Sequence, residues 1–305
     1  MPLLRVSPRA DVRLLTSFLT ARLSTDYATR VRSLYRMYPP ANLLSEQSTY
    51  LNVGYWETGS ESYDEAQEAL AGRLAEAAGM GPGDTVLDCG FGFGDQDFHW
   101  LATRRPHQIF GINVTPHHVA AARARARAEG VEGRLRFQRA SATDIPFPDG
   151  CFDRVVSLES AMHYRPRTRF FAEAFRVLRP GGVLAVADIV PMPGAGPRTA
   201  LGCPALDWVK QTVDDRNWHD RDDYAGKLET AGFRPVRVRS VRDRVWDPWI
   251  AYVTRTVDHP AFARRVSSLY RGILRWGMSD RVQLGRDLAR LDYVLASAVK
   301  PDSSA

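Results

Sequence analysis

The most constraining feature of this sequence is an apolar run that leads into three alternating glycines, Val86-Leu87-Asp88-Cys89-Gly90-Phe91-Gly92-Phe93-Gly94. The apolar residues have the length of a buried strand, and the residues from Asp95 onward are compatible with a helix. Glycines can adopt positive φ angles and let a ligand lie against bare backbone, and the first turn of a helix offers unpaired N–H groups. This stretch therefore predicts a strand, a ligand-binding turn and a helix N-terminus.

Acidic residues distinguish this turn from other glycine-rich turns. A dinucleotide-binding turn with G-x-G-x-x-G spacing requires a glycine where this chain has Asp95. Asp88 stands directly before the glycines, where a carboxylate can accept hydrogen bonds from turn amides and face a cationic ligand. Phosphate-binding turns avoid a negative group at that point. The turn thus favours a cationic ligand over a nicotinamide or flavin dinucleotide.

These residues resemble motif I of the class I S-adenosylmethionine-dependent methyltransferases, whose pattern is two apolar residues followed by Asp-x-Gly-x-Gly-x-Gly. The run Arg179-Pro180-Gly181-Gly182, followed by a strand and an aspartate, is a second similarity to this family. The resemblance implies S-adenosylmethionine as the cofactor. It places the aminocarboxypropyl end of the cofactor over the turn that contains Asp88, Gly90, Gly92 and Gly94.

Strand-like and helical segments alternate along the middle of the chain. Strands are expected at 85–87, 108–114, 135–140, 151–158, 183–186 and 236–241, and helices at 63–79, 95–104, 116–129, 167–178 and 220–231. Such alternation implies a parallel sheet with right-handed crossovers. We expect an α/β fold with a Rossmann-like, doubly wound sheet that is mostly parallel and has an antiparallel last strand at 291–299.

Helical additions are predicted at both ends of this core. Apolar residues at helical spacing over 11–37 indicate helices that form a lid, an oligomerisation arm, a membrane-surface element or an ordinary packed pair. Apolar and aromatic residues from Trp246 to Trp276 indicate helices inserted before the last strand, which in this family commonly roof the acceptor site. The expected domains are an N-terminal helical lid or arm (1–60), a cofactor-binding core (61–245), a helical lid (246–288) and the last strand and tail (289–305).

Further cofactor-binding candidates follow the strands, because ligands bind at the carboxyl ends of parallel strands. Asn113 ends the second strand, where most relatives place an acid that holds the ribose, and its amide can still donate and accept hydrogen bonds. The resemblance assigns adenine binding to Ser141, which replaces the family's acid, and to the main chain of Ala142. Leu158 ends the fourth strand. Tyr55 lies in an Asn-x-Gly-Tyr-Trp segment similar to one that closes over the cofactor in related enzymes.

Two residues are catalytic candidates. His163 follows the fourth strand and is placed like a histidine of similar O-methyltransferases, so we expect it to act as a general base in direct displacement. Asp188 follows the fifth strand and is expected either to orient or ionise that imidazole or to bind a substrate hydroxyl. A hydrogen-bonded structural histidine and a solvated loop acid are the alternatives. The expected function is methyl transfer to a small-molecule hydroxyl of a secondary metabolite or glycosylated natural product.

Two other functions remain open from the sequence. One is C- or N-methylation, including methylation coupled to cyclisation, of a lipid-like or polyketide acceptor, for which aromatic residues rather than a strong base are needed. The other is a non-catalytic, cofactor-binding scaffold subunit.

Composition limits the partners. The chain has 305 residues with 41 basic and 35 acidic side chains, which are interspersed as on ion-paired helix faces, so we expect no nucleic-acid partner. Three separated cysteines without metal-ligand spacing favour a reduced, cytoplasmic protein. No metal ligands are assigned, and metal-assisted sugar methylation through Asp188, Asp214 and Asp215 stays open as an alternative. No apolar run approaches ~18 residues, so no membrane span is expected. The predicted partner is a small-molecule acceptor, and a homo-oligomer is possible.

Overall fold

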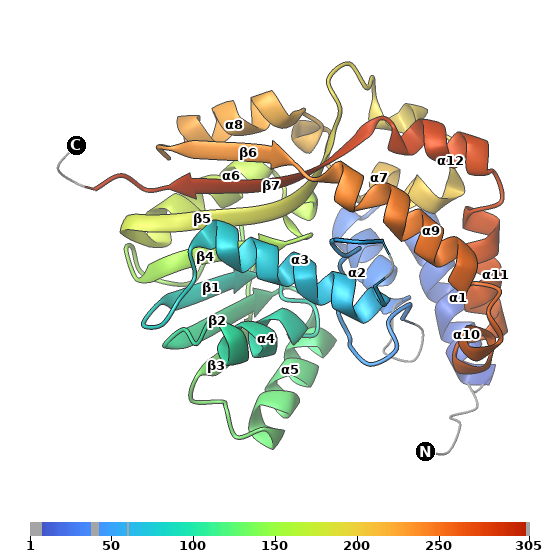
Figure 1. The fold of residues 1–305 in the computed structure, drawn as a ribbon, viewed down its shortest axis with the longest axis horizontal. Helices are drawn as coiled ribbons and strands as arrows, with labels where there is room; N and C mark the ends of the chain where they lie inside the picture. Colours follow the sequence, from blue (N-terminus) through green and yellow to red (C-terminus); the bar gives the residue numbers. More distant parts are fainter. Residues whose placement is uncertain (1–7, 38–42, 60, 303–305) are drawn as a thin grey trace.

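The computed structural model describes residues 8–37, 43–59 and 61–302, and its centre is a seven-stranded sheet (Figure 1). The strands are β1 (Thr85–Cys89), β2 (Gln108–Asn113), β3 (Leu135–Arg139), β4 (Phe152–Leu158), β5 (Leu178–Pro191), β6 (Val236–Ser240) and β7 (Leu291–Val299). Their order is β3-β2-β1-β4-β5-β7-β6. Strand β7 is antiparallel to both of its neighbours, while the paired strands from β3 to β5 are parallel. The predicted Rossmann-like sheet with an antiparallel last strand is confirmed.

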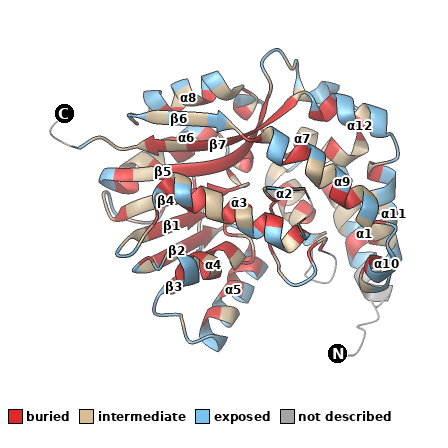
Figure 2. Cartoon of the chain, in the orientation of Figure 1, coloured by how far each residue is buried: buried red, intermediate tan, exposed pale blue. Residues whose placement is uncertain are grey.

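Helices cover both faces of the sheet. One face carries α3 (Tyr63–Ala78), α4 (Asp95–Thr103) and α5 (Pro116–Ala128), and the other carries α6 (Arg167–Val177) and α8 (Arg221–Thr230). A separate apolar cluster seals each face, with Leu70 and Phe98 in the first and Phe171 and Leu228 in the second. The central strands are buried along most of their length (Figure 2), as expected for parallel strands that are covered on both sides.

Local chemistry defines the ends of α3, which leads into the first strand. The Ser62 hydroxyl accepts a hydrogen bond from the Glu65 N–H, and the Glu65 carboxylate accepts one from the Ser62 N–H, so the two residues form a capping box. At the other end, Gly79 adopts a φ of 62° and ends the helix in the left-handed conformation. These two signals fix where α3 begins and ends.

A layer of helices from both ends of the sequence lies beyond the carboxyl ends of the parallel strands (Figure 1). It consists of α1 (Pro8–Leu23), α2 (Tyr27–Arg36), α7 (Asp207–Thr212), α9 (Trp246–Thr256), α10 (Pro260–Arg265), α11 (Ser268–Gly277) and α12 (Arg281–Leu288). Leu14 of α1 packs with Phe262 and Tyr270 in one buried cluster, so the N-terminal helices share a core with the C-terminal ones. Of the predicted arm 1–60, residues 1–7, 38–42 and 60 lie outside the described residues.

Two elements differ from the sequence-based expectation. Strand β5 continues beyond the predicted 183–186 as far as Pro191, because β7 pairs with it from Val183 to Pro191. Asp188 is therefore an interior residue of a paired strand, opposite Val294, and does not belong to a loop. Helix α7 lies between β5 and α8, where the sequence pattern did not indicate a helix.

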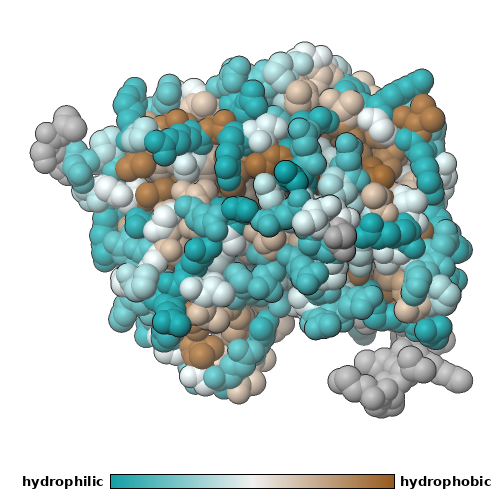
Figure 3. All heavy atoms as spheres, viewed as in Figure 1, coloured by the Kyte–Doolittle hydropathy of each residue, from teal (hydrophilic) through white to brown (hydrophobic). Residues whose placement is uncertain are grey.

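The surface seen in Figure 3 is covered mainly by hydrophilic side chains, and apolar side chains appear in small groups among them. Within the described ranges, none of the helices has both the length and the apolar character that crossing a membrane requires.

Candidate active site

A cavity of about 550 Å³ lies between the carboxyl edge of the sheet and the helical layer. Most of the predicted site residues line it, namely Gly90, Gly92, Asn113, Ser141, Ala142, Leu158 and His163. The helical layer adds aromatic side chains, including Tyr27, Tyr35, Trp249 and Trp276. The structure thus brings residues that end or follow four different strands, β1 to β4, to one cavity.

The glycine turn between β1 and α4 forms part of the cavity wall. Gly90 and Gly92 adopt φ angles of 90° and 57°, which residues with a side chain rarely adopt. In addition, a Cβ at Gly90 would overlap Oγ of Ser160. Gly94 has a different role, because it caps α4 and does not line the cavity. A Cβ there would lie 3.4 Å from Ala122 and Phe137, so this glycine lets α4, α5 and β3 pack closely.

Asp88 does not line the cavity itself but hydrogen-bonds to a side chain that does. It is fully buried, and Gln96 Nε2, from a residue that does line the cavity, donates a hydrogen bond to its Oδ2 at 3.0 Å. Burial raises the pKa of Asp88 to about 7, and burial together with Asp88 raises the pKa of the neighbouring Asp97 well above its usual range. The prediction that Asp88 faces the ligand is therefore corrected: it positions Gln96.

The end of β2 and the turn after β3 supply polar groups. Asn113 Oδ1 accepts a hydrogen bond from the N–H of Thr115 at 2.9 Å, which holds the side chain at the entry to α5. Ser141 Oγ accepts from the N–H of Thr143 and also bonds to its hydroxyl. Asp144, which follows the same turn, does not line the cavity. Ser141, Ala142 and Thr143 are thus the residues of this turn that line the cavity.

Tyr55 does not line the cavity, contrary to the sequence-based assignment. Its ring lies 5.3 Å from the guanidinium of Arg73, and its N–H donates to the Ala66 carbonyl of α3. The backbone turns away at Gly54, where a Cβ would press against Ala66 at 2.8 Å. The preceding residues 50–53 contact the cavity instead.

His163 lies at the cavity wall in a short 3-10 helix (Ala161–His163). Its Nδ1 is 3.1 Å from the Thr212 carbonyl oxygen, which can only accept, so Nδ1 carries the proton and Nε2 is the acceptor of the neutral ring. Burial lowers the pKa of His163 to about 4, with a smaller effect from Arg167. The imidazole is therefore neutral at physiological pH.

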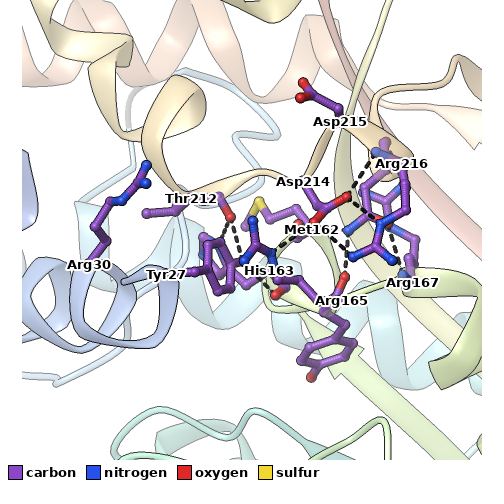
Figure 4. A network of polar contacts seen from close by, with 12 residues as sticks. Tyr27, Arg30, Met162, His163, Arg165, Arg167, Thr212, Asp214, Asp215 and Arg216 are labelled. Carbon is purple, nitrogen blue, oxygen red and sulfur yellow. Dashed lines mark hydrogen bonds and ion pairs between the residues drawn. The ribbon is translucent and has the colours of Figure 1, made fainter. Parts of the chain in front are cut away.

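A polar network joins this histidine to the helical layer (Figure 4). The Tyr27 hydroxyl lies 2.6 Å from the His163 carbonyl oxygen and 2.7 Å from that of Thr212. The guanidinium of Arg165 stacks on the Tyr27 ring at 3.5 Å and pairs with Asp214 at 2.8 Å. Helix α2 is thereby connected directly to the segment that carries the histidine.

Asp188 does not contact His163, and the prediction that it tunes the base is wrong. Its side chain is completely buried, does not line the cavity, and lies 2.9 Å from Nε of Arg167. The Tyr224 hydroxyl donates a hydrogen bond to the same carboxylate oxygen, Oδ2, at 3.2 Å. The physical reason is the extension of β5, which keeps Asp188 within the sheet under α6 and α8. The Thr212 carbonyl has the orienting role instead.

Sequence reasoning missed Glu159, the first residue after β4. Its Oε1 accepts hydrogen bonds from the Val53 N–H at 2.9 Å and from the Tyr293 hydroxyl at 2.7 Å, and the residue lines the cavity. Burial raises the pKa of Glu159 to about 7. Its φ of 48° is unusual for a side-chain-bearing residue, and such backbone strain often accompanies function. The sequence offered one indication of a functional role for this residue, namely an acidic side chain directly after the carboxyl end of a strand.

His118 is a second residue without an assigned role in the sequence analysis. It lines the cavity, only 2% of its surface is exposed, and neither ring nitrogen has a hydrogen-bond partner among the described residues. Its ring packs between Tyr35 and Phe93. Burial lowers the pKa of His118 to about 3, so the ring is a neutral polar group that a ligand can satisfy.

Comparison with known proteins identifies the class. The family described as "Methyltransferase domain" matches residues 87–186. Erythromycin 3''-O-methyltransferase of Saccharopolyspora erythraea is 44% identical over 90% of this chain and 91% of its own. The 27-O-demethylrifamycin SV methyltransferase of Amycolatopsis mediterranei is 32% identical over 83% of this chain and 90% of its own. The chain belongs to the class I S-adenosylmethionine-dependent methyltransferases, and S-adenosylmethionine is its cofactor.

The fold agrees with this assignment. Geranyl diphosphate C-methyltransferase of Streptomyces coelicolor superimposes with a TM-score of 0.67 at 16% identity, over 91% of this chain and 99% of its own. The cavity residues also fit the cofactor. Gly90 and Gly92 present a turn without side chains, and His118 offers buried nitrogen atoms that have no partner among the described residues. Within the described ranges no cluster of three or more His, Cys, Asp or Glu side chains is arranged to hold a metal.

Proposed function

We propose that this protein transfers a methyl group to a hydroxyl of a small-molecule natural product, with His163 as the general base. The observation that carries the proposal is the state of this imidazole. It is neutral, it lines the cavity, and its Nδ1–H is held by the Thr212 carbonyl, so Nε2 is the atom that accepts a proton. Similarity to enzymes named for O-methylation of erythromycin and rifamycin compounds supports the hydroxyl acceptor.

The cofactor, when bound, supplies an electrophilic methyl group on a sulfonium. The protein then has to align the acceptor, exclude water and remove one proton. We assign the glycine turn at Gly90 and Gly92 to the aminocarboxypropyl end, Asn113 to the ribose, and Ser141 with Ala142 to the adenine. Leu158 forms the adjoining apolar wall. These assignments rest on the position of each residue along the carboxyl edge of the sheet.

His163 acts after the acceptor has entered. Burial lowers the pKa of His163 to about 4, so the base form of the ring predominates at neutral pH. The proton of the acceptor hydroxyl would move to Nε2 as its oxygen takes the methyl group, whose bond to the sulfonium sulfur breaks and leaves a neutral thioether. Helix α2 and the 50–53 segment form part of the cavity wall, and Tyr35 of α2 packs edge to face against the His163 ring.

The first experiment is calorimetric titration of the purified protein with S-adenosylhomocysteine, with NAD as the control ligand. Binding of the first ligand alone is expected. Radiolabelled S-adenosylmethionine is then supplied with erythromycin lacking its 3''-O-methyl group or with 27-O-demethylrifamycin SV, and the methylated atom is located by NMR. A methyl group on carbon or nitrogen contradicts O-methylation. Tight cofactor binding without transfer to any hydroxylated acceptor favours the scaffold function instead.

A further inference from the structure

Among the described residues that line the cavity, the acidic ones are Glu159 and Asp207, and they differ in their partners. Asp207 pairs with Arg22 at 2.9 Å and with Lys210 at 2.6 Å, so the protein itself compensates its charge. No basic side chain of the described residues pairs with Glu159, and the one charge that acts on its pKa is the like charge of Asp188. Charges within a protein are normally paired, so the cation for Glu159 has to come from a ligand.

The two carboxylate oxygens of Glu159 have different surroundings. Oε1 accepts both hydrogen bonds, from the Val53 N–H at 2.9 Å and from the Tyr293 hydroxyl at 2.7 Å. Oε2 accepts none from the described residues, yet it is not sealed from the cavity that the residue lines. The protein therefore fixes the carboxylate through one oxygen and leaves the other available to a ligand.

The order of the strands shows in which direction this side chain points (Figure 1). Glu159 follows β4, and its partner Tyr293 belongs to β7, which lies two strands away in the order β1-β4-β5-β7. The glycine turn follows β1, on the opposite side of β4, and there Ser160 is the residue that packs against Gly90. The ends of β2 and β3, which carry the proposed ribose and adenine contacts, lie farther along that side. Glu159 is thus directed away from the residues assigned to the cofactor.

Aromatic side chains extend from this carboxylate along the cavity wall. The ring of Tyr293 lies edge to face with Trp246 of α9 at 5.8 Å, and Trp246 lies edge to face with Trp249 at 6.5 Å. The Nε1 of Trp249 donates a hydrogen bond to the Tyr63 hydroxyl at 3.3 Å. Tyr63, Trp246 and Trp249 all line the cavity and are called the aromatic wall below. Aromatic ring faces attract substituted ammonium groups, which have few N–H donors of their own.

We propose that Glu159 and the aromatic wall bind a protonated, alkyl-substituted amino group of the acceptor, while a hydroxyl of the same molecule lies beside His163. The substrate class is then a hydroxylated natural product that also carries an amine. This inference rests on the proposed function and adds the feature by which the site recognises its acceptor. The cofactor has an ammonium group of its own, so the cofactor as the source of the cation is the competing outcome.

The first test uses a small cation that needs no methylation site. Tetramethylammonium ion and its neutral counterpart tert-butanol are titrated calorimetrically into protein saturated with S-adenosylhomocysteine, at about pH 8, where Glu159 with its pKa of about 7 is mostly ionised. The proteins are the wild type, Glu159→Gln and the matched control Asp207→Asn, which removes the other carboxylate of the lining. Glutamine can still accept from Val53 and Tyr293, so Glu159→Gln is expected to fold, which thermal denaturation verifies.

We expect the wild type to bind tetramethylammonium and not tert-butanol. Glu159→Gln should weaken this binding about tenfold or more, because a close charge pair within the cavity is lost. Asp207→Asn should keep the wild-type affinity, since Arg22 and Lys210 already compensate Asp207. The proposal is overturned by equal binding of the two probes, by a wild type that does not bind the cation, by an unchanged affinity in Glu159→Gln, or by equal losses in both variants.

The affinity for S-adenosylhomocysteine identifies the source of the cation, because this ligand carries the ammonium group of the cofactor without the sulfonium. We expect Glu159→Gln to leave this affinity nearly unchanged. If the variant instead binds S-adenosylhomocysteine about tenfold more weakly, and the saturated wild type does not bind tetramethylammonium, Glu159 belongs to the cofactor site and the acceptor amine is rejected.

A pair of acceptors separates this inference from the proposed function. Both present the same hydroxyl, and the dimethylamino group of one is replaced by an isopropyl group in the other. The wild type should prefer the amine in kcat/KM, and Glu159→Gln should reduce this preference about tenfold, whatever its effect on both acceptors together. Transfer to both with equal kcat/KM in the wild type retains the reaction and rejects the amine site. Binding of tetramethylammonium that depends on Glu159, without methyl transfer to either acceptor, retains the site and rejects the reaction.

Discussion

Arg167 and Asp188 form an ion pair in which neither side chain has any exposed surface, with 2.9 Å between Nε and Oδ2. Removal of one partner would leave the other as an uncompensated buried charge, which typically costs ~3–5 kcal/mol. We therefore expect Asp188→Ala to lower the free energy of unfolding by about this amount, and the loss is measured by chemical denaturation. The kcat per folded molecule should remain within a few-fold of wild type.

A double variant controls for this interpretation. Replacing both charges, as in Arg167→Met/Asp188→Leu, removes the unpaired charge and should recover a large part of the stability that Asp188→Ala loses. The conservative variant Asp188→Asn tests whether the role of Asp188 is structural. If it kept wild-type stability but lost turnover by a hundredfold, Asp188 would have a catalytic role after all.

His163 is expected to matter for turnover and not for cofactor binding. His163→Ala should lower kcat by about 10²-fold or more, because a positioned base contributes on this scale. The affinity for S-adenosylhomocysteine, measured by calorimetry, should be nearly unchanged. The Tyr27 hydroxyl keeps both of its contacts in this variant, because they are made to the main-chain carbonyl oxygens of residue 163 and of Thr212. Full activity of His163→Ala would remove the histidine from the mechanism.

The pH dependence of kcat/KM separates the histidine from Glu159. Because the pKa of His163 is lowered to about 4, its base form already predominates near pH 6.5, and no histidine limb is expected there. The pKa of Glu159 is raised to about 7. As pH rises through 7, Glu159 ionises and adds a negative charge to the cavity. This charge stabilises the cation that His163 becomes when it accepts the proton of the acceptor hydroxyl. We expect kcat/KM to rise there, and Glu159→Gln to abolish that rise.

Stability gives an independent check on the same group. The folded state binds the Glu159 proton more tightly than the unfolded chain does, since the pKa is raised from 4.5. Ionisation therefore costs folding free energy, and the wild type should lose stability relative to Glu159→Gln as pH rises from about 4.5 through 7. The glutamine oxygen can still accept from Val53 and Tyr293, which makes it a matched replacement. A constant difference between the two proteins across this range would contradict the raised pKa.

The core of the fold was predictable because its signals are local. The alternation of apolar strands and amphipathic helices indicated the parallel sheet, and the glycines at 90 and 92 indicated the turn that lines the cavity. The position of Asn113 at the end of β2 followed from the same pattern. These features depend on short-range periodicity and on the φ angles that glycine permits, which a sequence displays directly.

The partners of the catalytic groups were not predictable in this way. Asp188 appeared to end a strand, but β7 extends the pairing past it from more than 100 positions later in the chain. The orienting contact of His163 comes from a main-chain carbonyl of Thr212, and a carbonyl leaves no trace in the residue type. Tyr55 is drawn away by packing on α3. Each error arose where a long-range contact, and not the local pattern, set the direction of a side chain.

The Tyr27 hydroxyl is expected to control how α2 closes the cavity. It is the contact that joins this helix to the carbonyl oxygens of His163 and Thr212. Tyr27→Phe keeps the ring on which Arg165 stacks but leaves those buried carbonyls without this donor, a loss of ~1–3 kcal/mol. We expect the KM for the acceptor to rise about five- to tenfold, and limited proteolysis to cut the α1–α2 region faster.

The matched comparison is Tyr27→Ala, which removes the ring as well as the hydroxyl. If α2 is a lid held by this hydroxyl, both variants should raise the acceptor KM, the alanine variant more strongly, while the affinity for S-adenosylhomocysteine changes little. Because the Thr212 carbonyl also orients His163, a fall in kcat together with an unchanged KM would show that the hydroxyl acts on the base instead. Wild-type kinetics in Tyr27→Phe, with faster proteolysis, would mean that α2 can leave the site without affecting the reaction.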